Sequence, residues 1–305
     1  MFYRELGKTG LMVSEVGFGG NRLGETHQPD EHWVKLIQQA VDLGVTLFDT
    51  SEQYAGGRSE TMLGLAVGNR PDVVIATKMS RNGPDGEIDL SAKRLRQAVE
   101  QSLRKLQREQ IEIYQLHSPR RADMERFDWA EGMSQLQAAG KIRLRAVAVN
   151  TVEDGIWLIE QGLVEVLQIT YNIFVTDPEA RLFALAAERG VGLMGRMPLA
   201  RGVLTGKFST NSGIPEDNRA YLDGERGLQR LALVDALRPL GATYAGGLTR
   251  LAHHFCLTPP AMSAIIPGAR NLEQLTENVA ASNGKGLPAD LLTQLEQLRA
   301  TWEAA

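Results

Sequence analysis

Short apolar stretches of strand length recur along the chain and alternate with segments of helical period. The stretches are rich in β-branched residues and apolar on both faces, which is typical of strands buried in a parallel sheet. They lie at residues 13–20, 45–50, 73–78, 111–117, 144–150, 165–172, 191–195 and 263–268. Because helical segments separate most of these eight stretches, the pattern favours a closed (β/α)₈ barrel of the TIM type over an open doubly wound sheet.

Two of the intervening segments carry clear helix signals. In residues 91–107 Ser91 is placed to cap the helix, and one face is apolar, at Ala92, Leu95, Val99, Leu103 and Leu106. In residues 30–44 we expect Asp30 to be the cap and Gly44 to end the helix. These amphipathic segments predict helices that cover the outer face of the barrel.

Two segments go beyond the minimal barrel. Residues 2–17 contain a Lys-Thr-Gly turn between short alternating runs, which predicts a β-hairpin that closes the barrel floor. Residues 204–227 are polar and rich in glycine, and a loop of this length in a compact domain is usually functional, as a lid or a clamp. Gly246 and Gly247 fall inside a further predicted helix, at a cost of roughly 1 kcal/mol each relative to alanine. No boundary interrupts the pattern, so residues 1–305 are predicted to form a single domain.

Composition narrows the classes of function. The net charge is −4 and basic residues are spread along the chain, which excludes the basic face of a nucleic-acid or anionic-membrane binder. The charged start of the chain does not suit a secretory signal, and the single Cys256 cannot form an internal disulfide, so we expect a cytoplasmic protein. Paired cysteines and zinc motifs are lacking, and the adjacent His253 and His254 diverge on a helix, so no metal site is predicted. Small molecules are the expected partners.

Four titratable side chains follow three neighbouring predicted strands at the same end. Asp49 ends one strand and Tyr54 follows it in a loop with glycine. Lys78 ends the next strand, and His117 ends the one after that. Each has an ordinary structural explanation, as a loop cap, a half-buried aromatic, a solvated strand end or a core histidine. Their coincidence where barrel enzymes carry functional groups favours one shared site.

These residue types suit proton transfer to a carbonyl oxygen. A phenol alone is a weak acid near neutrality, and a neighbouring ammonium group favours its phenolate. A carboxylate keeps that ammonium group charged and fixed, and a neutral imidazole can orient the carbonyl or relay the proton.

The same residues lie in segments that resemble the aldo-keto reductase family. "GVTLFDTSEQYAGGRSE" resembles the first signature of the family, with Asp49 and Tyr54 in its catalytic positions. "ATK" and "QLHSP" place Lys78 and His117 in the other two. The resemblance extends almost from end to end and implies an NAD(P)-dependent oxidoreductase that reduces aldehydes or ketones to alcohols, with Tyr54 as general acid. It also implies that the long loop of the C-terminal half lies over the cofactor site.

The resemblance further implies which residues contact the cofactor. Gln168 occupies the position that holds the nicotinamide carboxamide, and Arg196 the position against the nicotinamide ring. Around the pyrophosphate and the adenosine end, the implied contacts come mostly from the later strands. The full implied set is Gly20, Asn21, Asp49, Asn150, Gln168, Arg196, Pro198, Leu199, Ala200, Gly202, Lys207, Gly268, Arg270, Gln274 and Asn278.

Three departures from the family pattern bear on the cofactor. Ala148 and Val149 replace the Ser-Asn pair with which many members bind the nicotinamide carboxamide. The nearest asparagine, Asn150, is the next residue along the chain. Arg196 replaces a stacking tyrosine, and its planar guanidinium can still lie flat on a ring. The lysine that many NADPH-dependent members use is lost at Gly268, where Arg270 can bind the 2′-phosphate instead, so NADP is favoured and NAD stays possible.

Two other functions compete with the reductase. One is a regulatory barrel that binds the cofactor as a redox sensor and acts through a protein partner, and the intact set of four residues argues against it. The other is a Schiff-base aldolase with Lys78 as nucleophile, which the neighbouring Asp49 disfavours. The natural carbonyl or alcohol substrate, the direction of the reaction and the oligomeric state stay open, because fold resemblance does not fix them.

Overall fold

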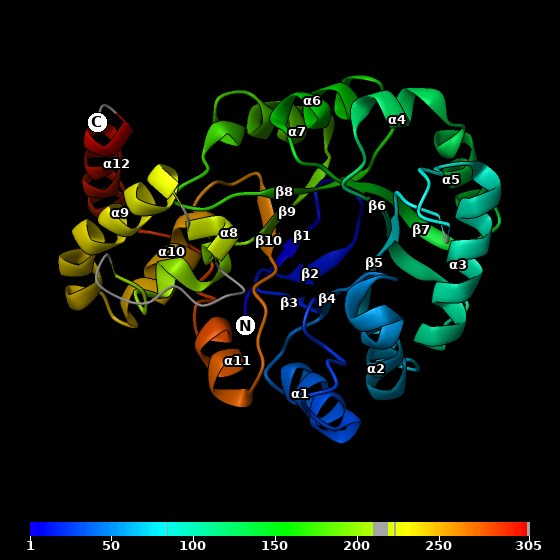
Figure 1. The fold of residues 1–305 in the computed structure, drawn as a ribbon, viewed down its shortest axis with the longest axis horizontal. Coiled ribbons are helices and arrows are strands. Elements are labelled where there is room, and N and C mark those ends of the chain that lie inside the picture. The colour runs from blue at the N-terminus through cyan, green and yellow to red at the C-terminus, as the bar shows by residue number, and fades with distance from the viewer. Residues whose placement is uncertain (84, 210–218, 223, 304–305) are drawn as a thin grey trace.

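Eight parallel strands form the central sheet in the described part of the chain, and together they build a barrel (Figure 1). The computed structural model describes residues 1–83, 85–209, 219–222 and 224–303. The barrel strands are β3 (Phe18–Gly19), β4 (Leu47–Asp49), β5 (Val74–Ser80), β6 (Ile111–His117), β7 (Ile142–Ala148), β8 (Val166–Thr170), β9 (Gly192–Arg196) and β10 (Met262–Ile265). They pair in chain order, and the parallel bridges Val16–Ile265 and Gly19–Gly268 join the two ends of the sheet. The predicted (β/α)₈ barrel is therefore confirmed.

Helices surround the strands on the outside (Figure 1). The α-helices are α1 (Asp30–Asp42), α2 (Arg58–Val67), α3 (Ala92–Leu106), α4 (Arg121–Arg126), α5 (Trp129–Ala138), α6 (Val152–Glu160), α7 (Leu182–Arg189), α8 (Arg219–Leu222), α9 (Gly224–Thr243), α10 (Gly247–Leu257), α11 (Leu272–Val279) and α12 (Ala289–Glu303). Short 3₁₀ helices are η1 (Tyr54–Gly57), η2 (Asp177–Glu179) and η3 (Ala200–Thr205). Within the described ranges, every helix is too short or too polar to cross a bilayer.

The inward side chains of the strands change from apolar to polar toward the carboxyl end. Successive residues of a strand face opposite sides, so residues two apart share the barrel interior. One buried cluster includes Leu47, Ala76, Ile113 and Val166. Two positions further along the same strands stand Asp49, Lys78, Gln115 and Gln168. The floor of the barrel is thus an apolar core, and its top is lined by polar groups.

The predicted hairpin closes the amino end of the barrel. β1 (Tyr3–Glu5) and β2 (Met12–Ser14) are antiparallel neighbours, and Leu6, Leu11 and Val13 belong to the same apolar cluster as the barrel floor. The backbone of Lys8 donates to Gly190 O at 2.8 Å, just before β9. The hairpin therefore leaves the carboxyl end as the place for a site.

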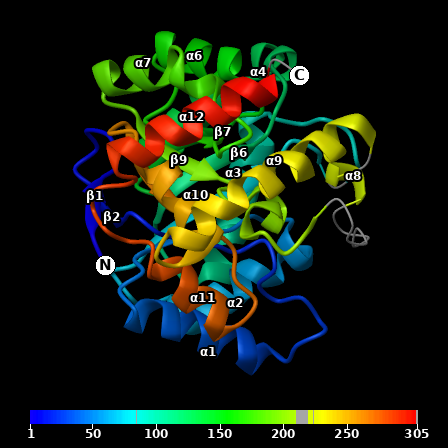
Figure 2. The same cartoon turned by 90° about the vertical axis from the view of Figure 1, so that its left-hand side faces the viewer.

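α9, α10 and α12 pack together on one flank, beside η3 and β10 (Figure 2). The prediction that Gly246 and Gly247 lie inside a helix is wrong for Gly246, which is the N-cap of α10, whereas Gly247 is the first residue of that helix. α9 ends at Thr243, and the two glycines have φ of +91° and +68° at the start of α10. Glycine adopts this left-handed conformation without the penalty of a Cβ atom, so the pair forms a helix junction.

Three other local predictions differ from the structure. The first predicted strand, 13–20, divides between β2 and β3. Pro29 occupies the N-cap of α1, and Asp30 pairs with Arg58 instead of capping. The predicted loop 204–227 is helical at 219–222 and from 224 onward, and its residues 210–218 and 223 lie outside the described residues. Ser91 caps α3 as predicted, by accepting from the backbone N–H of Arg94.

Candidate active site

An ion pair buried at the top of the barrel is the centre of the site. Lys78 Nζ donates to Asp49 Oδ2 at 2.6 Å and to the backbone oxygen of Thr50 at 2.8 Å. It also donates to Tyr54 Oη at 3.5 Å. Lys78 is fully buried and Asp49 is only 3% exposed, so water does not screen the pair. Since its three hydrogens all have acceptors, Lys78 is poorly suited to attack a carbonyl as a nucleophile.

Two glutamines complete the shell of Asp49. Gln168 Nε2 donates to Asp49 Oδ1 at 2.7 Å, and Gln115 Nε2 donates to the same oxygen at 3.1 Å. Gln168 also donates to Gln115 Oε1 at 3.2 Å. All three side chains are buried. Both carboxylate oxygens therefore have donors, which is what a buried charge requires.

His117 lies beside the phenol of Tyr54. The two rings are nearly perpendicular, at 84°, with centroids 5.6 Å apart. Burial, together with the charges of Lys78 and Arg196, lowers the pKa of His117 to about 3, so the imidazole is neutral near pH 7. Its Nδ1 lies 3.0 Å from Ser51 Oγ. The serine hydroxyl therefore influences which ring nitrogen carries the proton.

Arg196, at the end of β9, is held by four acceptors. Its Nη2 donates to Val149 O and to Asn150 Oδ1, both at 2.9 Å. Its Nε and Nη1 donate to Thr170 Oγ1 at 3.1 Å and to Ser118 Oγ at 3.2 Å. Burial lowers the pKa of this guanidinium. The planar group is thus fixed at the rim, as a surface for a flat ring requires.

The other implied cofactor residues fall into two neighbouring groups. The first is the segment after β9, from Pro198 through η3 to Lys207, where Ala200, Arg201 and Gly202 have φ of +47°, +57° and +85°. The step from Leu199 to Ala200 is of the right-handed to left-handed kind that forms anion-binding concavities. Arg201 and Lys207 add positive charge there, so the donor set fits the phosphates of a dinucleotide.

The second group connects the loops after β3 and β10. Asn278 Nδ2 donates to Gly268 O at 3.1 Å, and a Cβ on Gly268 would lie 3.2 Å from Asn21 Oδ1. The backbone N–H of Arg270 donates to Gln274 Oε1 at 2.9 Å. On the other side, the backbone N–H of Gly20 donates to Asp49 O at 2.6 Å. The last of these contacts joins the loop after β3 to the backbone of Asp49, whose side chain forms the ion pair.

Left-handed residues other than glycine are concentrated at this rim. In the described part of the chain they are Ala55, Gln107, Ser118, Met197, Ala200 and Arg201. Only Gln107, which ends α3, lies away from the loops that follow the barrel strands. Such strained backbone is typical of functional sites, where surrounding structure maintains it.

A pocket of about 370 Å³ opens beside His117. The residues that line it are Gln53, Ser80, Arg81, Asn82, His117, Ser118 and Asn150. Of the lining residues only His117 and Asn150 were predicted from the sequence, and Ser51 and Gln115 were not predicted either. A signal for Gln115 was available, because it interrupts an apolar strand two residues before His117. The rim loops carry no such periodic signal.

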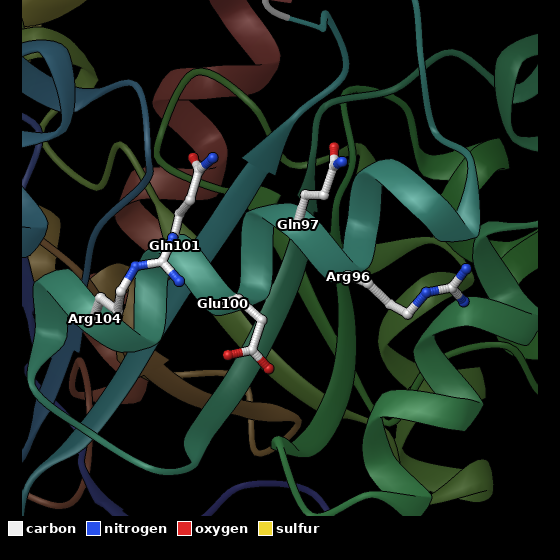
Figure 3. Close-up of a pocket in the computed structure, with 5 residues that line it drawn as sticks. All are labelled: Arg96, Gln97, Glu100, Gln101 and Arg104. Carbon is white, nitrogen blue, oxygen red and sulfur yellow. The ribbon is translucent and has the colours of Figure 1, made fainter.

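A larger depression, of about 490 Å³, lies on the outer surface of α3 (Figure 3). Its lining residues all come from one helix, and their side chains diverge (Figure 3). Glu100 pairs with Lys141 at 2.9 Å, and Arg96 donates to Gln135 Oε1 at 3.1 Å. We interpret it as the solvated face of an amphipathic helix, without the convergent groups of a site.

No three His, Cys, Asp or Glu side chains come together as a potential metal site in the described ranges. His253 and His254 are both buried on α10, where Nδ1 of His254 lies 2.5 Å from Tyr244 Oη. Cys256 is also buried on α10, and its Sγ donates to Tyr171 O.

Comparisons with known proteins agree with this geometry. The model of the aldo/keto reductase family matches residues 15–300. The chain is 30% identical to a probable voltage-gated potassium channel subunit beta of Arabidopsis thaliana, with 92% of this chain and 91% of that protein covered. It is 29% identical to an L-galactose dehydrogenase of the same plant, with 97% and 93% covered. Among solved structures, the holo form of an aldo-keto reductase from Bacillus halodurans superposes with a TM-score of 0.84, at 28% identity, with 98% of this chain and 96% of that one covered.

Proposed function

This chain belongs to the aldo/keto reductase family, enzymes that use nicotinamide cofactors, and from that premise we propose that it reduces aldehyde or ketone carbonyls to alcohols with Tyr54 as general acid. The observation that carries the proposal is the contact of Tyr54 Oη with Lys78 Nζ at 3.5 Å, inside the shell built around Asp49. The cofactor, when bound, supplies the hydride that reduces the carbonyl carbon.

The side chains of this protein supply the proton that the reduction requires. The carbonyl oxygen becomes negative as the carbon is reduced, and Tyr54 Oη delivers the proton that converts it to a hydroxyl. The buried ammonium group of Lys78 stabilises the phenolate that remains, and Asp49 keeps that ammonium group in place. Neutral His117, beside the phenol, can donate a hydrogen bond to the carbonyl oxygen and orient it.

The cofactor residues are also assigned by this proposal. Gln168 donates through Nε2 to Asp49 and Gln115, which leaves its Oε1 for the nicotinamide carboxamide. Arg196 supports the nicotinamide ring, and the segment from Pro198 to Lys207 binds the pyrophosphate. Arg270 binds the 2′-phosphate, so we expect NADPH to bind more tightly than NADH.

Replacing the phenol tests the assignment. Tyr54→Phe removes the proton donor and should lower turnover of a carbonyl substrate by about a hundred-fold or more, while NADPH binding stays near normal. Turnover of a panel of carbonyl compounds is measured by the loss of NADPH absorbance. Cofactor binding is measured by fluorescence. The matched control is Tyr114→Phe, because Tyr114 is buried on the outer side of β6. Near-normal turnover by Tyr54→Phe would contradict the proposed role.

A second candidate function is a regulatory barrel that binds the cofactor and acts through a protein partner. The similarity to a probable potassium channel subunit beta supports it. Both functions predict cofactor binding, and only the reductase predicts turnover. Tight NADPH binding combined with no activity on any carbonyl compound of the panel would favour the regulatory barrel.

A further inference from the structure

The pocket beside His117 has a wholly polar wall. Gln53, Ser80, Asn82, Ser118 and Asn150 contribute amide and hydroxyl groups, and no apolar or acidic side chain is among the described residues that line it. Small-molecule pockets are usually lined mainly by apolar side chains, and a volume of about 370 Å³ is near the small end of their range. The pocket therefore suits a small hydrophilic molecule.

Arg81 provides an unneutralised positive charge in this wall. Its side chain is half-buried, and its guanidinium forms no ion pair or hydrogen bond with any residue in the described part of the chain. The carboxylates nearby already have partners. Asp49 is paired with Lys78, and Glu52 accepts from Arg94 Nη2 and from the backbone N–H of Ser80, both at 2.8 Å. Arg81 is thus available to an anion from outside the protein.

The surroundings of Arg81 favour such an anion. The amide oxygen of Asn82 is buried and has no hydrogen-bond partner among the described residues, so a water molecule can donate one hydrogen to it and the other to an anion held by Arg81. Lys78 and Arg196 add positive potential at His117, which itself stays neutral. One guanidinium balances one negative charge and matches a planar carboxylate with two parallel hydrogen bonds.

We propose that the substrate is a small carbonyl compound that also bears a carboxylate, which Arg81 binds while Tyr54 and His117 meet the carbonyl oxygen. This inference rests on the proposed reductase function. In the reaction the carbonyl carbon gains a hydride and the oxygen gains a proton, so the carbonyl becomes a hydroxyl. The carboxylate is unchanged, and it serves only to hold and orient the substrate.

A pair of aldehydes that differ only in charge tests the proposal. We would measure kcat/KM with NADPH for 4-oxobutanoate and for its methyl ester, whose aldehyde groups are equivalent. The wild-type enzyme should prefer the acid by about ten-fold or more, and added salt should reduce that preference. Arg81→Gln should bring the ratio of acid to ester close to one, and Arg81→Lys should retain part of the preference.

A control variant and the remaining outcomes distinguish failure of the carboxylate proposal from failure of the proposed reductase function. Arg143→Gln changes an exposed arginine near the amino end of β7 and should leave both rates as in the wild type. Equal use of acid and ester by the wild type would overturn the carboxylate proposal and leave the reductase intact. If neither aldehyde is reduced and Tyr54→Phe changes nothing across the wider panel, the proposed function itself fails. Competitive inhibition of ester reduction by succinate, lost in Arg81→Gln, is a second readout.

Discussion

At the scale of single residues, the buried pair of Asp49 and Lys78 contributes both to the stability of the fold and to the proposed proton transfer. Removing one charge of such a pair leaves the other buried without a counter-ion, which typically destabilises a protein by 3–5 kcal/mol. Asp49→Asn should therefore lower the free energy of unfolding by about 3 kcal/mol or more. Urea denaturation followed by circular dichroism measures this change.

The double variant Asp49→Asn with Lys78→Met is the control for this prediction. It removes both charges and keeps a side chain of similar length, so no unpaired charge remains in the core. We expect it to be inactive and yet more stable than Asp49→Asn alone. If the single variant is as stable as the wild type, the pair is not a buried charge pair of the kind described.

The residues around the buried pair could be placed together from the sequence, because their positions follow from strand periodicity. Asp49, Lys78 and His117 end strands whose inward positions alternate, so their meeting at one rim could be predicted. Arg81 and Ser51 were missed, because they lie in loops whose conformation depends on neighbours distant in sequence. That Arg81 has no partner among the described residues is a property of the folded rim, which no local pattern encodes.

At the scale of elements, the hairpin contacts the barrel floor through a glycine without room for a side chain. Gly7 has a φ of +62°, and a Cβ there would lie 2.4 Å from both Gly190 O and Gly192 N. Gly10, in the same turn, has a φ of +70° and open space around it. Gly7→Ala should thus destabilise the protein by more than Gly10→Ala, whose loss is about 1–2 kcal/mol from backbone strain alone. Thermal unfolding of the two variants compares them, and equal losses would show that the hairpin is free to move off the floor.

Elements with strong local signals were predicted well, and those decided by tertiary contacts were not. Ser91 and the apolar face of α3 define that helix without help from the rest of the chain. Asp30 has the residue type of a cap, and the guanidinium of Arg58 engages it instead. Gly246 and Gly247 lie in a segment whose periodicity alone predicts a continuous helix. Tertiary packing on this flank decides where α9 ends and where α10 begins, so the sequence pattern did not predict the junction.

At the scale of the whole molecule, the partly buried His117 and the fully buried His253 make the fold sensitive to acid. Burial lowers the pKa of His117 to about 3, with Lys78 and Arg196 as further causes. Burial also lowers the pKa of His253 to about 3, with His254 and Arg250 as further causes. The unfolded chain binds these protons near pH 6.5, well before the folded chain does. Stability from both residues is therefore complete above about pH 6.5 and is lost as the pH falls toward 3.

This difference predicts a loss of about 2 kcal/mol per histidine in the free energy of unfolding between pH 7.5 and pH 5. Urea denaturation at the two pH values measures the loss. His253→Leu should remove its share, because both ring nitrogens of His253 lack partners in the described residues and a leucine carries no proton. His27→Asn is the control, since the ring of His27 is 53% exposed, and the loss should then match that of the wild type. A loss unchanged in His253→Leu would mean that His253 does not contribute to the acid sensitivity.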